Sequence, residues 1–357
     1  MFPSVTMSES STLQIQQHKK SFDTLQVGRA AAAIAVVFFH AHVFFIPERL
    51  YPGETISRVF NIGYSGVEFF FVLSGFIMIL VHRADIGVPA RARRFLRKRL
   101  VRIVPFYWVV TLALALLLWT QWPTSADRLS IERVMYSLFL IPIPDGSALL
   151  VGAAWTLSHE FLFYIVFYML IISPRFGVSA FVLWCAAVIA LIPSQPLNYP
   201  WNFFFSTYNL LFAMGMIAAL TFKKLPRRAA IFASMFGPIM FLAVGICDAF
   251  MIVDISHSVR TISFGVFAAI AVAGLAACER SVPLRVPRSL TFLGDASFSI
   301  YLVHGTVLPV AAKGMLFLNM SSVLSPLMSL FILVGLGVLA GSLAHIYIER
   351  PLLRALR

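Results

Sequence analysis

Ten long apolar segments follow one another along the chain, and they constrain its fold more than any single motif does. They cover approximately residues 25–46, 59–81, 103–119, 155–173, 178–193, 203–222, 229–247, 259–278, 291–312 and 324–348. A transmembrane helix needs about 20 predominantly apolar residues. Only 12% of the residues are charged, which is about half the share in an average soluble domain. The sequence therefore predicts an all-α integral membrane protein with about ten transmembrane helices.

The positive charges predict how these helices are oriented. If the N-terminus is cytosolic, 22 of the 28 lysines and arginines fall in cytosolic segments, where membrane proteins carry their excess of these residues. We therefore expect both termini in the cytosol. The predicted parts are a cytosolic tail (1–24), a multi-span domain (25–350) and a cytosolic tail (351–357), with Pro351 expected to stop the last helix. Loop asymmetry accounts for the net charge of +13, so no nucleic-acid partner is expected.

The first apolar segment carries two ionisable residues, Arg29 and His40. Such groups cost about 3 kcal/mol each in a membrane span, and they usually mark a function. Eleven residues correspond to three helical turns plus roughly 20°, and to roughly 16 Å along the axis. The spacing predicts one helix face with a permanent cation near one end and a base, His40, in mid-membrane.

A cluster of seven basic residues in the first cytosolic loop, ARARRFLRKRLVR, precedes Pro105. Arg99 and Arg102 are three residues apart, so they share a helix face at the membrane boundary. Three interpretations are open. The cluster can be an orientation signal, an interfacial helix on anionic lipid, or a site for a phosphate-bearing ligand, since arginine binds phosphate bidentately.

The second apolar segment holds Glu68 and the tripeptide Ser74-Gly75-Phe76. Gly75 allows another helix or a ligand to approach the backbone closely, and Ser74 can form a hydrogen bond across an interface. Ordinary helix packing explains the tripeptide as well as a ligand site does. A carboxylate such as Glu68 needs a partner inside a membrane.

The longest outer segment, about 120–154, contains the apolar stretch MYSLFLIPIP. This stretch is too short to cross a membrane. It is expected to form a re-entrant or interfacial piece over an outward cavity.

The fourth and ninth segments contain the remaining candidate residues. Glu160 follows Trp155 closely and is either part of an interface anchor or functional. No zinc motif such as HExxH accompanies His159 and Glu160, so no metal is expected. Tyr301 and His304 are three residues apart and face the same way. Core hydrogen bonding is the simpler role for each of them.

Together these motifs resemble the membrane acyltransferase-3 family. The matching motifs are Arg29 with ten residues before His40, SGF at 74–76, RKRLVRIVPFYW with Arg99 and Arg102, WTLSHEFLFY at 155–164, SFSIYLVH at 297–304 and ERP at 349–351. The resemblance covers nearly the whole chain and is greatest to exopolysaccharide O-acetyltransferases. Two positions depart from the family pattern. Glu68 stands where aspartate is usual, and LQVG precedes Arg29 where an LDGLR-like sequence is usual.

The resemblance implies a multi-pass enzyme of the bacterial inner membrane, without a tightly bound cofactor. It transfers an acyl group, expected to be acetyl, from cytosolic acyl-CoA to a hydroxyl of an outer glycan or lipid-linked oligosaccharide. Two alternatives stay open. The acyl group can pass through an acyl-histidine, or the chain can be a transporter or flippase of a lipid-linked sugar. The lack of repeated halves with broken helices in the sequence is evidence against a transporter.

The same resemblance assigns expected roles to the polar residues of the spans. The donor site is expected to contain Arg29, Ser74, Arg99 and Arg102, because the arginine-rich inner face can hold the phosphates of CoA. His40 is expected to deprotonate the sugar hydroxyl as a general base, and Glu160 to orient His40 or the acceptor. Acceptor or structural roles are expected for Glu68, Tyr301 and His304.

Overall fold

The computed structural model describes residues 22–120, 126–281 and 286–356, which form helices and connecting segments without a β-strand. The α-helices are α2 (Asp23–Phe44), α3 (Gly66–His82), α4 (Ala92–Trp119), α5 (Ile131–Phe139), α6 (Trp155–Ile172), α7 (Pro174–Ala190), α8 (Trp201–Phe204), α9 (Tyr208–Thr221), α10 (Arg227–Ala249), α11 (His257–Ser281), α12 (Arg288–Phe317), α13 (Pro326–Ala344) and α14 (Arg350–Ala355). Short 3₁₀ turns extend or join them at Arg58–Ser65, Arg83–Asp85, Pro89–Arg91, Ala126–Leu129, Gly152–Ala154, Ile192–Ser194, Phe222–Lys224 and Met320–Ser322. Two π-helical turns lie at Ile46–Leu50 and His345–Glu349.

The predicted all-helical, multi-span architecture is confirmed. Within the described ranges, nine helices, counted with their helical extensions, are long and apolar enough to cross a membrane. The remaining expected span, 178–193, corresponds to α7, which is apolar but has 17 residues. It is about 26 Å long, slightly less than the hydrocarbon core. The cytosolic position of the termini stays a prediction, and most of the expected tail 1–24 lies outside the described residues.

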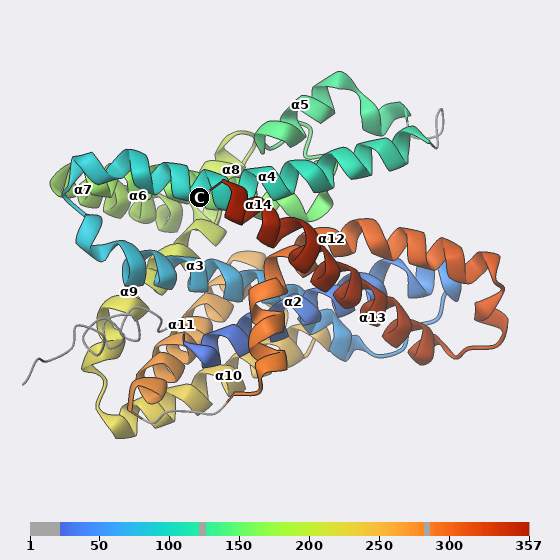
Figure 1. The fold of residues 1–357 in the computed structure, drawn as a ribbon. Helices are drawn as coiled ribbons and strands as arrows, with labels where there is room; N and C mark the ends of the chain where they lie inside the picture. The colour runs from blue at the N-terminus through green and yellow to red at the C-terminus, as the bar shows by residue number, and fades with distance from the viewer. Residues whose placement is uncertain (1–21, 121–125, 282–285, 357) are drawn as a thin grey trace, which may run out of the picture.

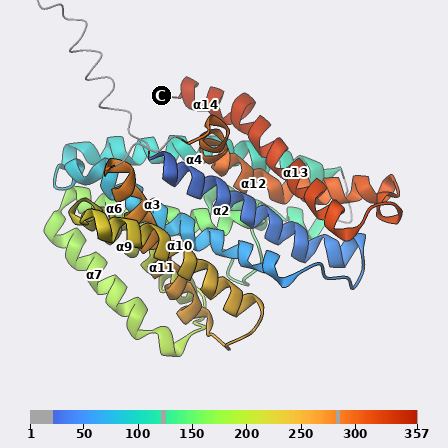
Figure 2. The same ribbon diagram turned by 90° about the horizontal axis from the view of Figure 1, so that it is seen from below.

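Helix α2 occupies the centre of the helix bundle. Figure 2 shows α12 and α13 along one side of α2, and α3, α9, α10 and α11 on the other. In Figure 1 the helices α4, α5, α6 and α7 form a further layer on the far side of α3. Arg29 and His40 are therefore carried by a helix that has protein neighbours on both sides.

The start of α2 is held by a carboxylate from α11. Glu279 accepts hydrogen bonds from the backbone N–H groups of Asp23 (2.7 Å) and Thr24 (2.9 Å). The first N–H groups of a helix lack partners within the helix, and the helix dipole favours a negative charge there. This contact fixes the position of α2 along its axis, and hence the depth of Arg29.

The glycine of the SGF motif allows α3 and α9 to touch. A Cβ atom added at Gly75 would lie 2.1 Å from the carbonyl oxygen of Phe212, which is far inside van der Waals contact. Only glycine permits this approach. The expected close helix packing at Gly75 is confirmed, and it leaves the adjacent Ser74 free for a different role.

The sixth span is interrupted, which the sequence analysis did not predict. Helices α8 and α9 are separated by Phe205–Thr207, and the side-chain amide of Asn209 donates to the carbonyl oxygens of Phe203 (3.0 Å) and Phe204 (3.1 Å). Its Oδ1 lies 2.9 Å from Nδ1 of His159 on α6. Broken helices persist in membranes only where such groups are satisfied by protein. A lone asparagine in an apolar segment is the feature that could have indicated the break.

Helix α5 packs beside the middle of α4. The Tyr107 hydroxyl donates to the carbonyl oxygen of Ser137 (2.6 Å), and Nε1 of Trp108 donates to that of Leu138 (2.9 Å). Tyr107 precedes the last residue of α4, Trp119, by roughly 18 Å along the helix axis. The re-entrant and interfacial alternatives of the sequence analysis both stay predictions.

The expectation that Pro351 stops the last helix is wrong. The chain continues from α13 through the π-helical turn His345–Glu349 into α14, which ends at Ala355. Pro351 lies in the first turn of α14. A proline is tolerated in a first turn, because its missing N–H would have no partner within that helical segment.

Candidate functional site

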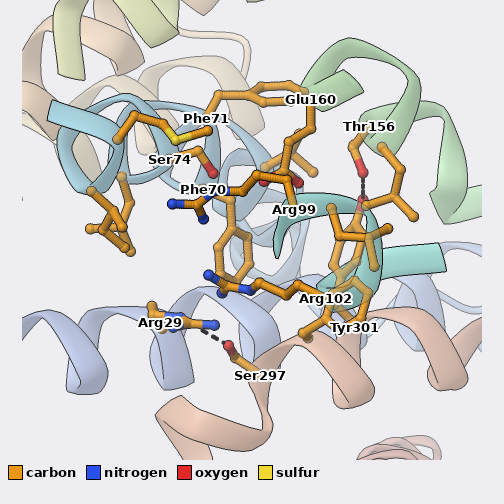
Figure 3. Close-up of a pocket in the computed structure, with 17 residues that line it drawn as sticks. Arg29, Phe70, Phe71, Ser74, Arg99, Arg102, Thr156, Glu160, Ser297 and Tyr301 are labelled. Carbon is orange, nitrogen blue, oxygen red and sulfur yellow. Dashed lines mark hydrogen bonds between the residues drawn. The ribbon is translucent and has the colours of Figure 1, made fainter. Parts of the chain in front are cut away.

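One cavity inside the helix bundle collects most of the candidate residues. Side chains from α2, α3, α4, α6 and α12 line it (Figure 3). Its polar wall includes Arg29, Ser74, Arg99, Arg102, Glu160 and Tyr301, and phenylalanine, leucine and isoleucine side chains form most of the remainder. The structure therefore brings together all four expected donor-site residues, although they are widely separated in the sequence.

Three arginines dominate the charge of this cavity. Nε of Arg29 donates to the hydroxyl oxygen of Ser297 (3.2 Å) on the neighbouring α12. Arg99 is buried, with its guanidinium carbon 5.8 Å from the ring centroid of Tyr164. Arg102 lies one turn further along α4, and Figure 3 shows its guanidinium group between those of Arg29 and Arg99.

None of these three arginines forms an ion pair with a carboxylate of the described residues, although Glu160 in the cavity wall interacts electrostatically with Arg29 and Arg99. Nε of Arg99 is buried and has no hydrogen-bond partner among those residues. Charges removed from water are costly unless they are paired. The cavity therefore has the chemistry of an anion site, and guanidinium groups suit phosphate in particular.

The basic cluster on α4 divides into two groups. Arg93, Arg94 and Arg97 are exposed, whereas Arg99 is buried and Arg102 is half-buried. The exposed arginines fit the interpretations of an orientation signal and a lipid contact. The ligand-site interpretation applies to Arg99 and Arg102, whose shared helix face points into the cavity, as their spacing predicts.

Glu160 lies in the cavity wall and is connected to a tyrosine of its own helix. The hydroxyl of Tyr164 donates a hydrogen bond to Oε1 of Glu160. The described contacts do not connect Glu160 with His40, so the expected role of orienting His40 has no direct contact behind it. Its carboxylate can instead accept a hydrogen bond from a group inside the cavity.

His40 lies outside the cavity, on the same face of α2 as Arg29. Arg29 binds Ser297 and His40 contacts His304, so both side chains of α2 point toward α12, as the helical period predicts. The ring centroids of His40 and His304 are 4.8 Å apart. Nδ1 of His40 lies 2.9 Å from the carbonyl oxygen of Val36. His40 itself is half-buried.

Tyr301 lines the cavity and is also adjacent to His304. Its hydroxyl donates to the carbonyl oxygen of Ala153 (3.2 Å) and lies 3.1 Å from Oγ1 of Thr156, the contact drawn in Figure 3. Its ring centroid is 5.9 Å from that of His304, which confirms that these residues face the same way. Tyr301 lines the cavity and His304 does not.

Glu68 lies outside the cavity, although it interacts electrostatically with one other candidate, Tyr301. It is the third residue of α3, is 1% exposed, and does not line the cavity. Its Oε2 atom is buried and has no hydrogen-bond partner among the described residues. Its carboxylate interacts electrostatically with Arg260, near the start of α11, and with Asp248, near the end of α10. The structure thus does not place the Glu68 side chain in the wall of the arginine cavity.

Sequence reasoning missed three polar residues whose contacts support the site. Ser297 binds Arg29, Thr156 contacts Tyr301, and Glu349 accepts hydrogen bonds from Ser299 (2.6 Å) and from Nδ1 of His345 (2.6 Å). Ser297 could have been found from its position one helical turn before Tyr301. Glu349 belongs to the ERP motif, which the sequence analysis used as a helix end and as part of the family resemblance, without a role for the Glu349 carboxylate.

Comparison with known proteins adds independent information. A family model described as an acyltransferase domain (Acyl_transf_3) matches residues 22–347. The chain is 30% identical over 318 residues to the exopolysaccharide production protein ExoZ of Rhizobium meliloti (strain 1021), which covers 84% of this chain and 93% of that protein. It is 26% identical, over an alignment of 366 residues, to the acyltransferase MdmB of Streptomyces mycarofaciens, covering 91% of this chain and 90% of that protein. No solved structure matches the chain.

Proposed function

This chain is a multi-pass membrane acyltransferase of the acyltransferase-3 family, and from this membership we propose that it moves an acetyl group from acetyl-CoA to a glycan hydroxyl. The observation that carries the proposal is the cavity in which Arg29, Arg99 and Arg102 meet without an ion pair to any carboxylate of the described residues. Membership of an acyltransferase family also favours an enzyme over the alternative of a sugar transporter.

The arginine cavity is proposed to hold the anionic part of the donor. Coenzyme A carries several phosphate charges, and a guanidinium group offers each phosphate two parallel donors. Ser74 of α3 also lines the cavity and can donate a further hydrogen bond. Exposed arginines at the start of α4 surround the expected cytosolic entrance and would raise the local concentration of the anionic donor.

His40 is proposed to be the general base. Its Nδ1 faces the carbonyl oxygen of Val36, which can only accept a hydrogen bond, so the ring hydrogen of neutral His40 lies on Nδ1. Nε2 is then left with a lone pair that can take a proton from an alcohol. The alcohol oxygen forms a bond to the thioester carbon, the carbon–sulfur bond breaks, and His40 returns the proton to the sulfur.

The proposal requires the wall at Tyr301 to open. Tyr301 lines the arginine cavity, and His40 lies outside it, in contact with His304, whose ring is next to that of Tyr301. A thioester whose phosphates stay on the arginines must therefore pass Tyr301 to reach His40. Glu160, on the cavity side, is proposed to orient the donor or the acceptor hydroxyl rather than the His40 ring.

The acceptor is proposed to be an exopolysaccharide or another cell-surface glycan, modified at the bacterial inner membrane. The 30% identity to a protein named for exopolysaccharide production supports this class of acceptor. Ester-linked acetyl groups on surface polysaccharide, compared by mass spectrometry between cells with and without the gene, test it. Identical acetylation in the two polysaccharides would exclude an exopolysaccharide as the acceptor.

The role of His40 is tested with purified protein, acetyl-CoA and polysaccharide from cells that lack the gene. Positioned general bases contribute typically 10²- to 10⁴-fold, so we expect His40→Gln to lower turnover by about that factor. The KM for acetyl-CoA should change little, because the phosphates are bound elsewhere. His42→Gln is the matched control, since His42 is a buried histidine of the same helix that contacts Phe60 and not His304. Near-normal turnover of His40→Gln would place the base elsewhere, with Glu160 the next residue to test.

A further inference from the structure

The second histidine of the pair, His304, has no role in the reaction described so far. It lies on α12, is 1% exposed, and its ring centroid is 4.8 Å from that of His40, with an angle of 60° between the ring planes. Two imidazole rings in contact inside a membrane are costly unless their nitrogens are satisfied. The pair therefore calls for an explanation beyond apolar packing.

The two rings have the same hydrogen-bonding pattern. Nδ1 of His40 lies 2.9 Å from the carbonyl oxygen of Val36, and Nδ1 of His304 lies 3.3 Å from that of Ile300. Each carbonyl belongs to the residue one helical turn earlier, and it can only accept. In the neutral state both hydrogens are therefore on Nδ1, and both Nε2 atoms have lone pairs.

Nε2 of His304 is the atom that lacks a partner. It is buried and has no hydrogen-bond partner in the described parts of the chain. The neighbouring polar groups do not supply one. The hydroxyl of Tyr301 is bonded to Ala153 and Thr156, and that of Ser299 to Glu349. A buried acceptor of this kind is satisfied only when a donor arrives next to it.

We propose that His304 is the positioning residue that receives a hydrogen bond from protonated His40 during acyl transfer. The inference rests on the proposed function, in which His40 removes the hydroxyl proton. When that proton reaches Nε2 of His40, the imidazolium becomes a donor beside the unpartnered Nε2 of His304. This hydrogen bond from Nε2 of His40 to Nε2 of His304 lasts until the carbon–sulfur bond breaks. The proton then moves from His40 to the sulfur and leaves in the thiol of CoA. Both histidines are neutral again at the end of the cycle.

The energetic effect of this contact is specific to the charged state of His40. A hydrogen bond to a charged group is stronger than one between neutral groups, and more so in a low-dielectric interior. The contact is absent while His40 is neutral and forms as His40 gains its proton. It therefore stabilises the transition state relative to the bound substrates, and it should affect kcat and not the affinity for the donor.

Two variants of nearly equal shape test the role of His304. Glutamine at position 304 offers an oxygen that accepts a hydrogen bond, whereas methionine fills the same space without a comparable acceptor. We expect His304→Met to lower kcat by roughly 10- to 100-fold and His304→Gln to lie between this variant and the native protein. The KM for acetyl-CoA should stay within about twofold in both, which also shows that the cavity has folded.

The controls separate a failure of this inference from a failure of the proposed function. His42→Met removes another buried histidine, whose Nδ1 is likewise without a partner, and should keep the native kcat. If His40→Gln is inactive and His304→Met has the native kcat, His304 takes no part and His40 can still be the base. Equal losses in the Gln and Met variants would show that accepting a hydrogen bond is irrelevant at this position. Native activity of His40→Gln would contradict the proposed base itself.

Discussion

Two groups of side chains in this protein have the same composition, an arginine, a tyrosine and a carboxylate. In the first, Arg260 of α11 forms an ion pair with Asp248 of α10 (2.8 Å), and the Tyr64 hydroxyl donates to the second oxygen of that carboxylate (2.6 Å). The guanidinium carbon of Arg260 lies 5.2 Å from the centroid of the Tyr64 ring. Each member contacts both others, and the charges compensate one another.

The second group, in the cavity, is connected differently. Arg99 lies over the Tyr164 ring at 5.8 Å, and Tyr164 donates to Glu160, but no ion pair joins Arg99 to Glu160. The second group therefore lacks the ion pair between arginine and carboxylate that the first group has. The comparison teaches that composition alone does not distinguish a structural cluster from a binding site. The missing ion pair between Arg99 and Glu160 distinguishes the two, because it leaves the Arg99 guanidinium group available to a ligand.

The largest expected difference between the groups concerns donor binding. The double substitution Arg99→Ala/Arg102→Ala removes two charged phosphate donors and should weaken acetyl-CoA binding by at least about tenfold. Arg260→Ala should leave that affinity unchanged and lower the Tm instead. Calorimetric titration of the purified protein with acetyl-CoA measures the first effect, and thermal unfolding measures the second. Equal weakening of donor binding in the two proteins would mean that the second group is not the donor site.

A smaller contrast is expected between the two carboxylates. Asp248→Asn removes the counterion of Arg260, so the Tm should fall by a few degrees while turnover per folded molecule is kept. Glu160→Gln breaks no ion pair, and the amide oxygen of the glutamine can still accept the hydrogen bond from Tyr164. The Tm should therefore change little. Turnover should nevertheless fall roughly tenfold, because a charged acceptor in the cavity is lost. A Tm loss in Glu160→Gln as large as that in Asp248→Asn would make both groups structural.

The smallest contrast comes from replacing each arginine with lysine. The ion pair of Arg260 with Asp248 is a single contact, through Nη1, which an ammonium group can also make. We therefore expect Arg260→Lys to be nearly silent in activity and Tm. Arg99→Lys should weaken acetyl-CoA binding several-fold, since a point charge cannot bind phosphate bidentately. Full affinity of Arg99→Lys for acetyl-CoA would indicate that the site binds phosphate through the positive charge alone and not through a bidentate contact.

The sequence predicts those features of this fold that depend on one helix at a time. Apolar length locates the spans because backbone groups in lipid have to be satisfied within the helix. The helical period places Arg29 and His40 on one face, and the structure confirms this by directing both toward α12. The same reasoning correctly pairs Tyr301 with His304.

Contacts between helices could not be derived in this way. The hydrogen bond from Arg29 to Ser297 joins residues 268 positions apart, and no local pattern encodes it. The position of the arginine cavity relative to His40 also depends on how α2, α6 and α12 pack. The break before α9 escaped prediction because hydropathy records composition and not the hydrogen bonds that Asn209 makes to the interrupted backbone.

The contact of Tyr301 with Ala153 and Thr156 has a consequence for the membrane as a barrier. A polar cavity that ran without interruption from the arginines to the histidines would give water and protons a continuous path through the bundle. The Tyr301 ring lines the arginine cavity and lies 5.9 Å from the ring of His304, so it is adjacent to both polar regions. If the donor passes Tyr301 as proposed, a tyrosine that opens only while the donor fills the space would keep the passage closed throughout the cycle. In that proposal the same side chain would admit the donor and exclude ions.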